Sequence, residues 1–487
     1  MKLKYQYGLL FILSISTLTA CNNSSVIDEI DSSPDNNETD SNETDSNEIN
    51  KDLSTYFTQT TQAVDVTPKT AADTASLSNY GVHTPTDFFL NDDGSIDVYW
   101  QDTDSAWHIS QFDNVLAPET TVEIILPTSI NQQGRFLGFT KNPLNETYYI
   151  GYSKDNQFAE RDTDGSCVSN DDKGYNCNAE YWVSAFSSTG EESYNTRIFG
   201  ELDLSIKDVS GGTTKGNPGQ AAVGVMKYIP HLEKLAIYTG HLQRFGDQIR
   251  HQAGWFGMVD SMGVAETWGG WYSSHNFDQR IQLTSDENIY TLAHGDAYPR
   301  ALQLTQWDQQ QSKSAYTYQY YAIENGSTGD NKTLADTGDL TILSDDSAAI
   351  AFATQDSRTS KDVRLKIMTG IKAGEITETQ DLWLTEYGAE KTAGKGIKIA
   401  TVAEDKVLVA WNTFEGETPA EGKKKGEYID STVAIYNLEG DALYSMTIED
   451  RLMPTQTLQV NSAGTAAVWV TTSEDGIILN HIDLTIL

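Results

Sequence analysis

The sequence predicts an all-β fold, and three observations point to it. Short stretches of alternating apolar and polar residues recur throughout the chain behind residue 53, with almost no helical period. Turns rich in Gly, Asp and Ser separate these stretches. The same order of strands also returns along the chain. This internal repeat argues for one repetitive domain rather than the two or three domains that 487 residues would otherwise suggest.

Each repeat has an apolar strand, a tight turn, a second and very apolar strand, a variable loop, a third strand that ends near Asp or Gly, and a more polar fourth strand. One copy reads RIQLTS from Arg280, IYTLA from Ile289 and ALQLTQWD from Ala301. The first strands of the seven copies are DFFL from Asp87, RFLGF from Arg135, AAVGVM from Ala221, RIQLTS from Arg280, LTILS from Leu340, IKIATV from Ile397 and TLQV from Thr457.

These copies resemble the blades of a seven-bladed β-propeller, although six or eight blades also fit the spacing. The seventh copy ends at Leu487 after its third strand. The segment YFTQTTQAV from Tyr56 alternates suitably and precedes the first repeat. We expect this N-terminal strand to complete the last blade, because it would close the ring and cover a free strand edge.

Residues 1–20 have the pattern of an export signal, with two lysines followed by an apolar run from Gly8 to Ile15. The tetrapeptide LTAC, ending at Cys21, resembles the lipobox of bacterial lipoproteins. That resemblance implies that Cys21 is lipidated and anchors the protein in a membrane. Asn22 in place of Asp implies the outer membrane, on either its periplasmic or its surface face. An ordinary signal peptide that happens to end near a cysteine is the alternative.

Residues 21–53 form an acidic, low-complexity segment in which NETDS occurs twice. It has too few apolar residues to bury a core, so we expect a disordered tether between the lipid and a domain at 54–487. No other run of about twenty apolar residues occurs, and the lipid is therefore the only expected anchor. The formal net charge of −37 argues against a nucleic-acid partner.

An acidic loop in the second repeat is a candidate metal site. Cys167 and Cys177 lie ten residues apart in it and are predicted to form a disulfide, with a zinc site as the alternative. Closely spaced carboxylates beside Gly have the oxygen ligands that calcium prefers, but no complete EF-hand spacing is present, and a solvated acidic loop is the default explanation. The candidate calcium ligands are Asp162, Asp164, Asp171 and Asp172.

The resemblance to propellers also implies which loops share a face. In that fold, the loops between second and third strands open on the same face as the connections between blades. Long loops on a rigid scaffold commonly carry binding residues. The predicted ligand-binding residues on this face are His241, Arg244, Arg250 and His251 in the third blade, His275, Asp278 and Arg280 at the crossing into the fourth, and His294, Asp296, Tyr298 and Arg300 in the fourth.

Some of these residues have structural explanations as well. Asp278 and Arg280 could tie two blades together and satisfy buried backbone groups. An aromatic group comprising Trp255, Trp268, Trp271 and Tyr272 could stack on sugars or pack in the core.

We predict a membrane-tethered binding module for a glycan, a peptide or an envelope protein. One alternative is a lyase-like enzyme on an acidic polysaccharide. Its catalytic candidates would be His251, His275, His294, Tyr298 and Arg300, acting by acid–base chemistry and with or without a metal. Another alternative is a structural assembly factor of the envelope. The sequence lacks the GxSxG, P-loop, dinucleotide-binding, HExxH and CxxCH motifs, and calcium is the only cofactor that it suggests.

Overall fold

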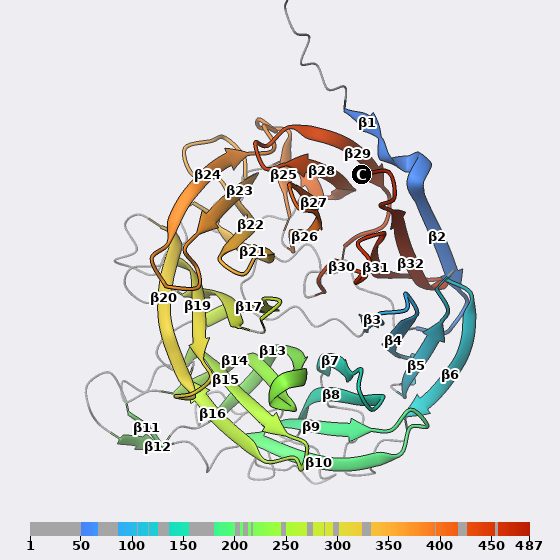
Figure 1. Ribbon diagram of the computed structural model, residues 1–487, viewed down its shortest axis with the longest axis vertical. Helices are drawn as coiled ribbons and strands as arrows, with labels where there is room; N and C mark the ends of the chain where they lie inside the picture. Colours follow the sequence, from blue (N-terminus) through green and yellow to red (C-terminus); the bar gives the residue numbers. More distant parts are fainter. Residues whose placement is uncertain are drawn as a thin grey trace, which may run out of the picture. The chain divides into compact units, whose positions relative to one another are not determined.

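The computed structural model describes residues 50–66, 86–104, 106–114, 116–124, 136–154, 180–199, 205–207, 213–215, 218–244, 250–269, 276–286, 288–295, 301–323, 333–394, 396–416, 426–452 and 456–487. All of them belong to one compact unit, residues 48–487, which begins slightly before the predicted boundary at 54. In this unit, seven antiparallel sheets are arranged as blades around a central axis (Figure 1). The predicted seven-bladed β-propeller is confirmed.

The first three blades follow the chain in order. Blade 1 contains β3 (Thr86–Leu90), β4 (Ile96–Gln101), β5 (Trp107–Phe112) and β6 (Pro118–Ile124). Blade 2 contains β7 (Phe136–Asn142), β8 (Thr147–Lys154), β9 (Glu180–Phe186) and β10 (Glu192–Phe199). A separate hairpin, β11 (Ser205–Lys207) and β12 (Thr213–Lys215), follows. Blade 3 contains β13 (Pro218–Ile229), the 3-10 turn η2 (Pro230–Leu232), β14 (Lys234–Arg244), β15 (Arg250–Asp260) and β16 (Ala265–Gly269).

The remaining blades repeat the scheme. Blade 4 contains β17 (Asn276–Leu283), β18 (Ile289–Gly295), β19 (Ala301–Asp308) and β20 (Lys313–Ala322). Blade 5 contains β21 (Asp336–Ser344), β22 (Ser347–Thr354), β23 (Asp362–Thr369) and β24 (Thr377–Trp383). Blade 6 contains β25 (Lys391–Ala393), β26 (Lys398–Ala403), β27 (Lys406–Glu415), β28 (Tyr428–Asn437) and β29 (Ala442–Ile448). Blade 7 contains β30 (Gln459–Val460), β31 (Ala466–Ser473) and β32 (Gly476–Asp483).

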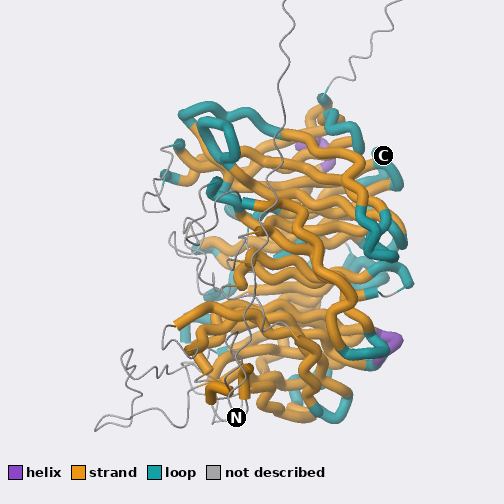
Figure 2. Tube along the Cα trace, turned by 90° about the vertical axis from the view of Figure 1, so that its left-hand side faces the viewer, coloured by secondary structure: helices purple, strands orange, loops and turns teal. Residues whose placement is uncertain are grey.

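The position of a strand within its blade explains its composition. The first strand of each blade lies nearest the axis (Figure 1), and the second strand is sandwiched between neighbouring sheets. Second strands are therefore buried on both faces and read as continuous apolar runs, as in β18 and β22. Viewed from the side, the strands run between the two faces of the ring and the turns lie at both (Figure 2).

Tight turns connect first to second strands. In blade 1, Asn91 N donates to the carbonyl of Ser95, and Gly94 N donates back to Asn91 O. Gly94 adopts a φ of +88°, which a residue without a Cβ adopts at little cost. The Asp/Asn/Gly turns noted in the sequence are therefore the hairpin turns of the blades.

The segment before the first repeat closes the ring, as predicted. Strand β2 (Phe57–Gln62) pairs antiparallel with β32, from Phe57 opposite Ile482 to Gln62 opposite Ile477. Strand β1 (Lys51–Asp52) pairs parallel with β29, so the same segment also borders blade 6. Residues 51–62, which we call the strap, therefore cover the outer edges of the last two blades.

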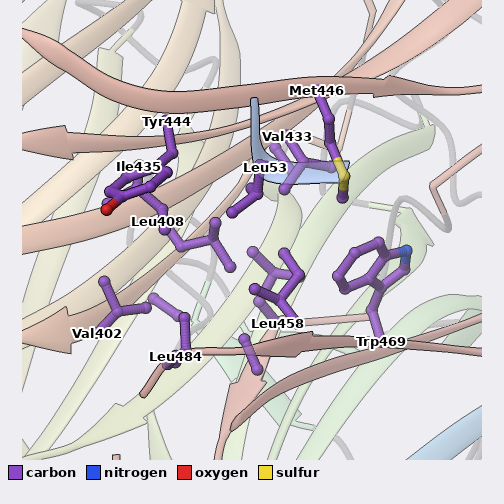
Figure 3. Packing of buried hydrophobic residues seen from close by; sticks show 14 of the residues in the cluster. Leu53, Val402, Leu408, Val433, Ile435, Tyr444, Met446, Leu458, Trp469 and Leu484 are labelled. Atoms are coloured by element: carbon purple, nitrogen blue, oxygen red, sulfur yellow. The ribbon is translucent and has the colours of Figure 1, made fainter. Parts of the chain in front are cut away.

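The core under the strap explains why it stays in place. Leu53 begins the 3-10 turn η1 (Leu53–Tyr56) between the two strands and is fully buried. It packs in a cluster with Met446 of blade 6 and Trp469 of blade 7 (Figure 3). Phe57 stacks on Trp469 with ring centroids 5.8 Å apart. Burial of these apolar side chains stabilises the closed ring.

Candidate ligand-binding site in the central channel

The first strands of all seven blades enclose a cavity of about 570 Å³ in the central channel. Its walls come from the later parts of these strands and from turns after them, including Pro143, Pro230 and Ser285. The cavity therefore extends toward the face that carries the first-to-second-strand turns. This face is opposite the one on which the sequence predicted the binding residues.

Lys227 of β13 extends into this cavity. Its Nζ donates a hydrogen bond of 2.9 Å to Oε1 of Gln282, which lies on β17 of the next blade. Within the described part of the chain, this neutral amide is its hydrogen-bond partner, and no carboxylate pairs with it. Burial lowers the pKa of the Lys227 ammonium, and the negative charge of Asp339 partly offsets this effect.

Lys141, the other lysine that lines the cavity, differs from Lys227 in that it is paired with carboxylates. Its Nζ lies 2.9 Å from Asp97 Oδ2 and 2.9 Å from Asn91 Oδ1, and it also pairs with Glu146. The positive charge of Lys141 is thus neutralised by two carboxylates. Lys227 has no such carboxylate partner in the described residues, so its ammonium can bind an anionic group of a ligand.

Asp87 of β3 brings a carboxyl group to the same cavity. Burial raises the pKa of Asp87 to about 7, although hydrogen bonds from backbone amides and the charge of Lys398 oppose the shift. One of those amides is the N–H of Phe88, which lies 2.9 Å from Oδ1 of Asp87. A carboxyl group with this pKa can accept or release a proton near neutral pH.

A group of buried charges lies at the cavity, and one of them, Arg280, is part of its wall. Arg280, Asp339 and Lys398 lie on the first strands of blades 4, 5 and 6, with exposed fractions of 4%, 0% and 3%. Burial raises the pKa of Asp339, and the charges of Arg280 and Lys398 oppose that shift. Burial also lowers the pKa of Lys398, and the neighbouring Arg280 charge lowers it further.

The predicted residues of blade 4 lie within strands. His294, predicted in a loop, is the penultimate residue of β18 and is fully buried. The reason is that β18 continues to Gly295 as a completely buried strand. Asp278 and Arg280 lie within β17 rather than at the crossing into the blade, and a bulge between Phe277 and Arg280 gives Asp278 a φ of +53°. Arg280 is one of the residues that line the central cavity, and its charge also acts on Asp339 of blade 5 and Lys398 of blade 6.

The predicted loop of blade 3 is shorter than expected. His241 and Arg244 belong to β14, and Arg250 and His251 begin β15. The two strands continue pairing up to Arg244 opposite Arg250, because the hairpin extends beyond its apolar part. The other predicted residues lie outside the described residues: Cys21, Asp162, Asp164, Cys167, Asp171, Asp172, Cys177, His275, Asp296, Tyr298 and Arg300.

Two of the four residues of the predicted aromatic group can be assigned. Trp255 and Trp268 are 1% and 5% exposed and pack in the core of blade 3 and its neighbours. Trp271 and Tyr272 lie outside the described residues. In the described ranges, no cluster of three or more His, Cys, Asp or Glu side chains could hold a metal ion, and no helix is long and apolar enough to cross a membrane.

Sequence reasoning missed Lys227, Gln282 and Asp87 as channel residues. A usable signal was nevertheless present. Charged residues interrupt otherwise apolar first strands, as Lys227 does in AAVGVMKYI and Lys398 does in IKIATV. The first strand of a blade lies beside the central channel, so a charge at this point can face the channel instead of a neighbouring sheet.

No protein-family model and no curated protein matches this chain. Among solved structures, it is similar to a protein of unknown function from Dyadobacter fermentans, with 8% identity and a TM-score of 0.43 over 78% of this chain and 99% of that one. The polysaccharide lyase Uly1 is similar with 9% identity and a TM-score of 0.42, over 82% and 90%. The C-terminal WD40 domain of Sif2 is similar with 9% identity and a TM-score of 0.41, over 84% and 97%. The seven sheets themselves define the class, a β-propeller.

Proposed function

We propose that this protein is a binding module whose ligand enters the central channel. The observation that carries the proposal is the cavity of about 570 Å³ with the ammonium of Lys227 in its wall and no carboxylate partner for it in the described part of the chain. Its size falls within the roughly 300–1,000 Å³ of small-molecule sites, which combine apolar walls with a few polar groups. Phe89, Phe139 and Tyr228 supply such walls here.

We further propose that the module works at the cell envelope. The lipobox-like sequence at Cys21 and the acidic segment after it support a lipid-anchored protein on a flexible tether in the outer membrane. A tethered module of this kind would capture a glycan, a peptide or a segment of another envelope protein. The outer-membrane location can be tested by fractionation of cells that carry Cys21→Ser, which should move the protein into the soluble fraction.

A pair of tryptophan variants tests whether the ligand occupies the channel. Ser285 lines the cavity at its exposed end, so Ser285→Trp should obstruct entry without disturbing the core. Ser462→Trp is the control, because Ser462 is equally exposed in a first-to-second-strand turn but does not line the cavity.

The measurement is calorimetric titration of the purified protein with a panel of neutral and acidic oligosaccharides and peptides. We expect at least one member to bind, with an affinity that Ser285→Trp reduces and Ser462→Trp does not. Two results contradict the proposal: no binding anywhere in the panel, or binding that both variants leave unchanged.

An enzyme that acts on an acidic polysaccharide is the second candidate, and Asp87 is the observation in its favour. A cavity carboxyl with a pKa of about 7 can act as a general acid or base, and strongly shifted groups concentrate at active sites. Incubation with uronate polymers should then yield unsaturated products that absorb in the ultraviolet, and Asp87→Asn should abolish them. A silent assay, with and without added metal ions, argues against this candidate.

A further inference from the structure

We infer that the ligand group recognised in the channel is an oxyanion, a carboxylate or a sulfate, held jointly by Lys227 and Gln282. This inference rests on the proposed function and adds the chemical class of the ligand. The two residues lie on the first strands of adjacent blades, and their side chains are held together by the 2.9 Å hydrogen bond. Both line the cavity.

The donor geometry of this pair suits an oxyanion. The Lys227 ammonium has three N–H donors, of which one is directed to Gln282 Oε1. Because Oε1 of Gln282 accepts this bond, the adjacent amide nitrogen of Gln282 brings two further N–H donors next to the ammonium. An ammonium and an amide that donate side by side can each bind one oxygen of a carboxylate or sulfate, and the charged hydrogen bond is the stronger.

Three lysines that are more deeply buried than the half-buried Lys227 support the same conclusion. Lys141, Lys361 and Lys366 are each buried and each pairs with at least one carboxylate. Lys227 pairs with none in the described ranges, although burial lowers its pKa. An uncompensated charge in such a place costs free energy, which an anionic ligand would offset on binding.

The surroundings limit how the ligand enters. The cavity extends to the first-to-second-strand turns at Pro143, Pro230 and Ser285, so a ligand can reach Lys227 from that face. Thr140, Phe139 and Tyr228 also line the cavity. An acidic sugar unit combines an anionic group with hydroxyl groups and an apolar ring face. Such a unit would place its anionic group at Lys227 and leave the rest of the glycan directed toward solvent.

The test uses three probes: sodium glucuronate, sodium sulfate and glucose. We expect one or both anions to bind the purified protein, and glucose to bind at least tenfold more weakly. Lys227→Met should lower the affinity for the anion at least tenfold, and Gln282→Leu should lower it less. Lys234→Met is the matched control, because Lys234 is a partly exposed lysine of the same blade that pairs with Glu266.

Glucuronate binding more tightly than sulfate would identify a carboxylate as the preferred group, and the reverse order would identify a sulfate. Thermal unfolding checks that the variants are folded. Lys227→Met removes a half-buried charge that has no carboxylate partner in the described ranges, so its melting temperature should be unchanged or higher.

Different results would overturn the inference and the proposed function. If Ser285→Trp abolishes the binding of glucose or a neutral oligosaccharide and Lys227→Met leaves its affinity unchanged, the channel is a binding site but the oxyanion inference is wrong. Anion binding that Lys227→Met leaves intact also overturns the inference. If no ligand binding at all depends on Ser285→Trp, the proposed function itself fails.

Discussion

Lys141 and Asp97 form a salt bridge of 2.9 Å that joins blade 2 to blade 1, and their side chains are only 3% and 2% exposed. Asp97 also accepts hydrogen bonds from Tyr148 at 2.9 Å and from Gln111 at 3.1 Å. One buried carboxylate thus satisfies donors from both blades. Such networks tolerate the loss of a member poorly, because every group left behind is buried without its partner.

Replacement of Asp97 by Leu should therefore destabilise the ring strongly. Of the described carboxylates, it leaves Lys141 with Glu146 alone, and breaking a buried pair typically costs about 3–5 kcal/mol. Glu146→Gln is the control, because Glu146 is 54% exposed and exposed pairs contribute roughly 0–1 kcal/mol. Urea unfolding measures both. Equal midpoints for the two variants would contradict the structural role of Asp97.

The packing of the strap against blades 6 and 7 leads to a second prediction about stability. Leu53 is fully buried between blades 6 and 7, so Leu53→Ala should cost about 2–5 kcal/mol through lost burial and the cavity left behind. Leu144→Ala makes the same chemical change at a side chain that is 71% exposed and should be nearly neutral. Thermal melting compares them, and a Leu53→Ala variant as stable as the wild type would show that the strap contributes little to closure.

Deletion of the strap should change the state of association. A chain that starts at residue 63 lacks β1 and β2 and therefore exposes the outer edge of β32. An unpaired strand edge pairs readily with another chain, so we expect dimers or aggregates in light scattering. A chain that starts at residue 48 retains the whole compact unit and should stay at the mass of the full-length protein. Identical masses for the two truncated chains would refute the prediction.

Gly338 and Gly388 provide a matched pair for backbone strain. Both have a φ of +66°, so alanine at either position should cost about 1–2 kcal/mol for the left-handed conformation alone. A Cβ at Gly388 meets no atom, whereas one at Gly338 would overlap the carbonyl oxygen of Ala351. Overpacking adds roughly 1–3 kcal/mol, so Gly338→Ala should be clearly the more destabilised variant in urea unfolding. Equal costs would mean that β21 and β22 can separate freely.

Asp87 should make the free energy of unfolding decrease as the pH rises, which is the opposite of the usual effect of a buried, salt-bridged carboxylate. Because burial raises its pKa from 3.8 to about 7, the folded protein binds more protons than the unfolded chain between these values, and stability falls as the pH rises. Asp87→Asn removes this effect and should be more stable than the wild type at pH 8, by up to about 4 kcal/mol. The difference should shrink to a small constant near pH 4. A difference that does not vary with pH would show that the carboxyl is solvated.

Much of the fold could be predicted because short stretches of sequence specify the strands and turns of each blade. Tight turns, built from Asp, Asn or Gly in most repeats, and apolar second strands recur along the chain, and β2 carries the alternation that an outer strand requires. The candidate site could not be predicted in the same way. Gln282 lies 55 residues after Lys227, and nothing near either residue in the chain indicates that they touch. His294 looked like a loop residue because the apolar run ends before it, yet pairing extends β18 past it.

The sequence by itself determined the all-β class, the repeated blade unit and the closure by an N-terminal strand, and the tertiary structure fixed the number of blades at seven. The three properties that the sequence determined follow from residue periodicity and turn chemistry, which act over a few neighbouring positions. Only the tertiary structure decided which charges face the channel and which of them are compensated. Whether Lys227 has a carboxylate partner depends on side chains contributed by neighbouring blades, and closure of the ring brings these side chains together across long stretches of the chain.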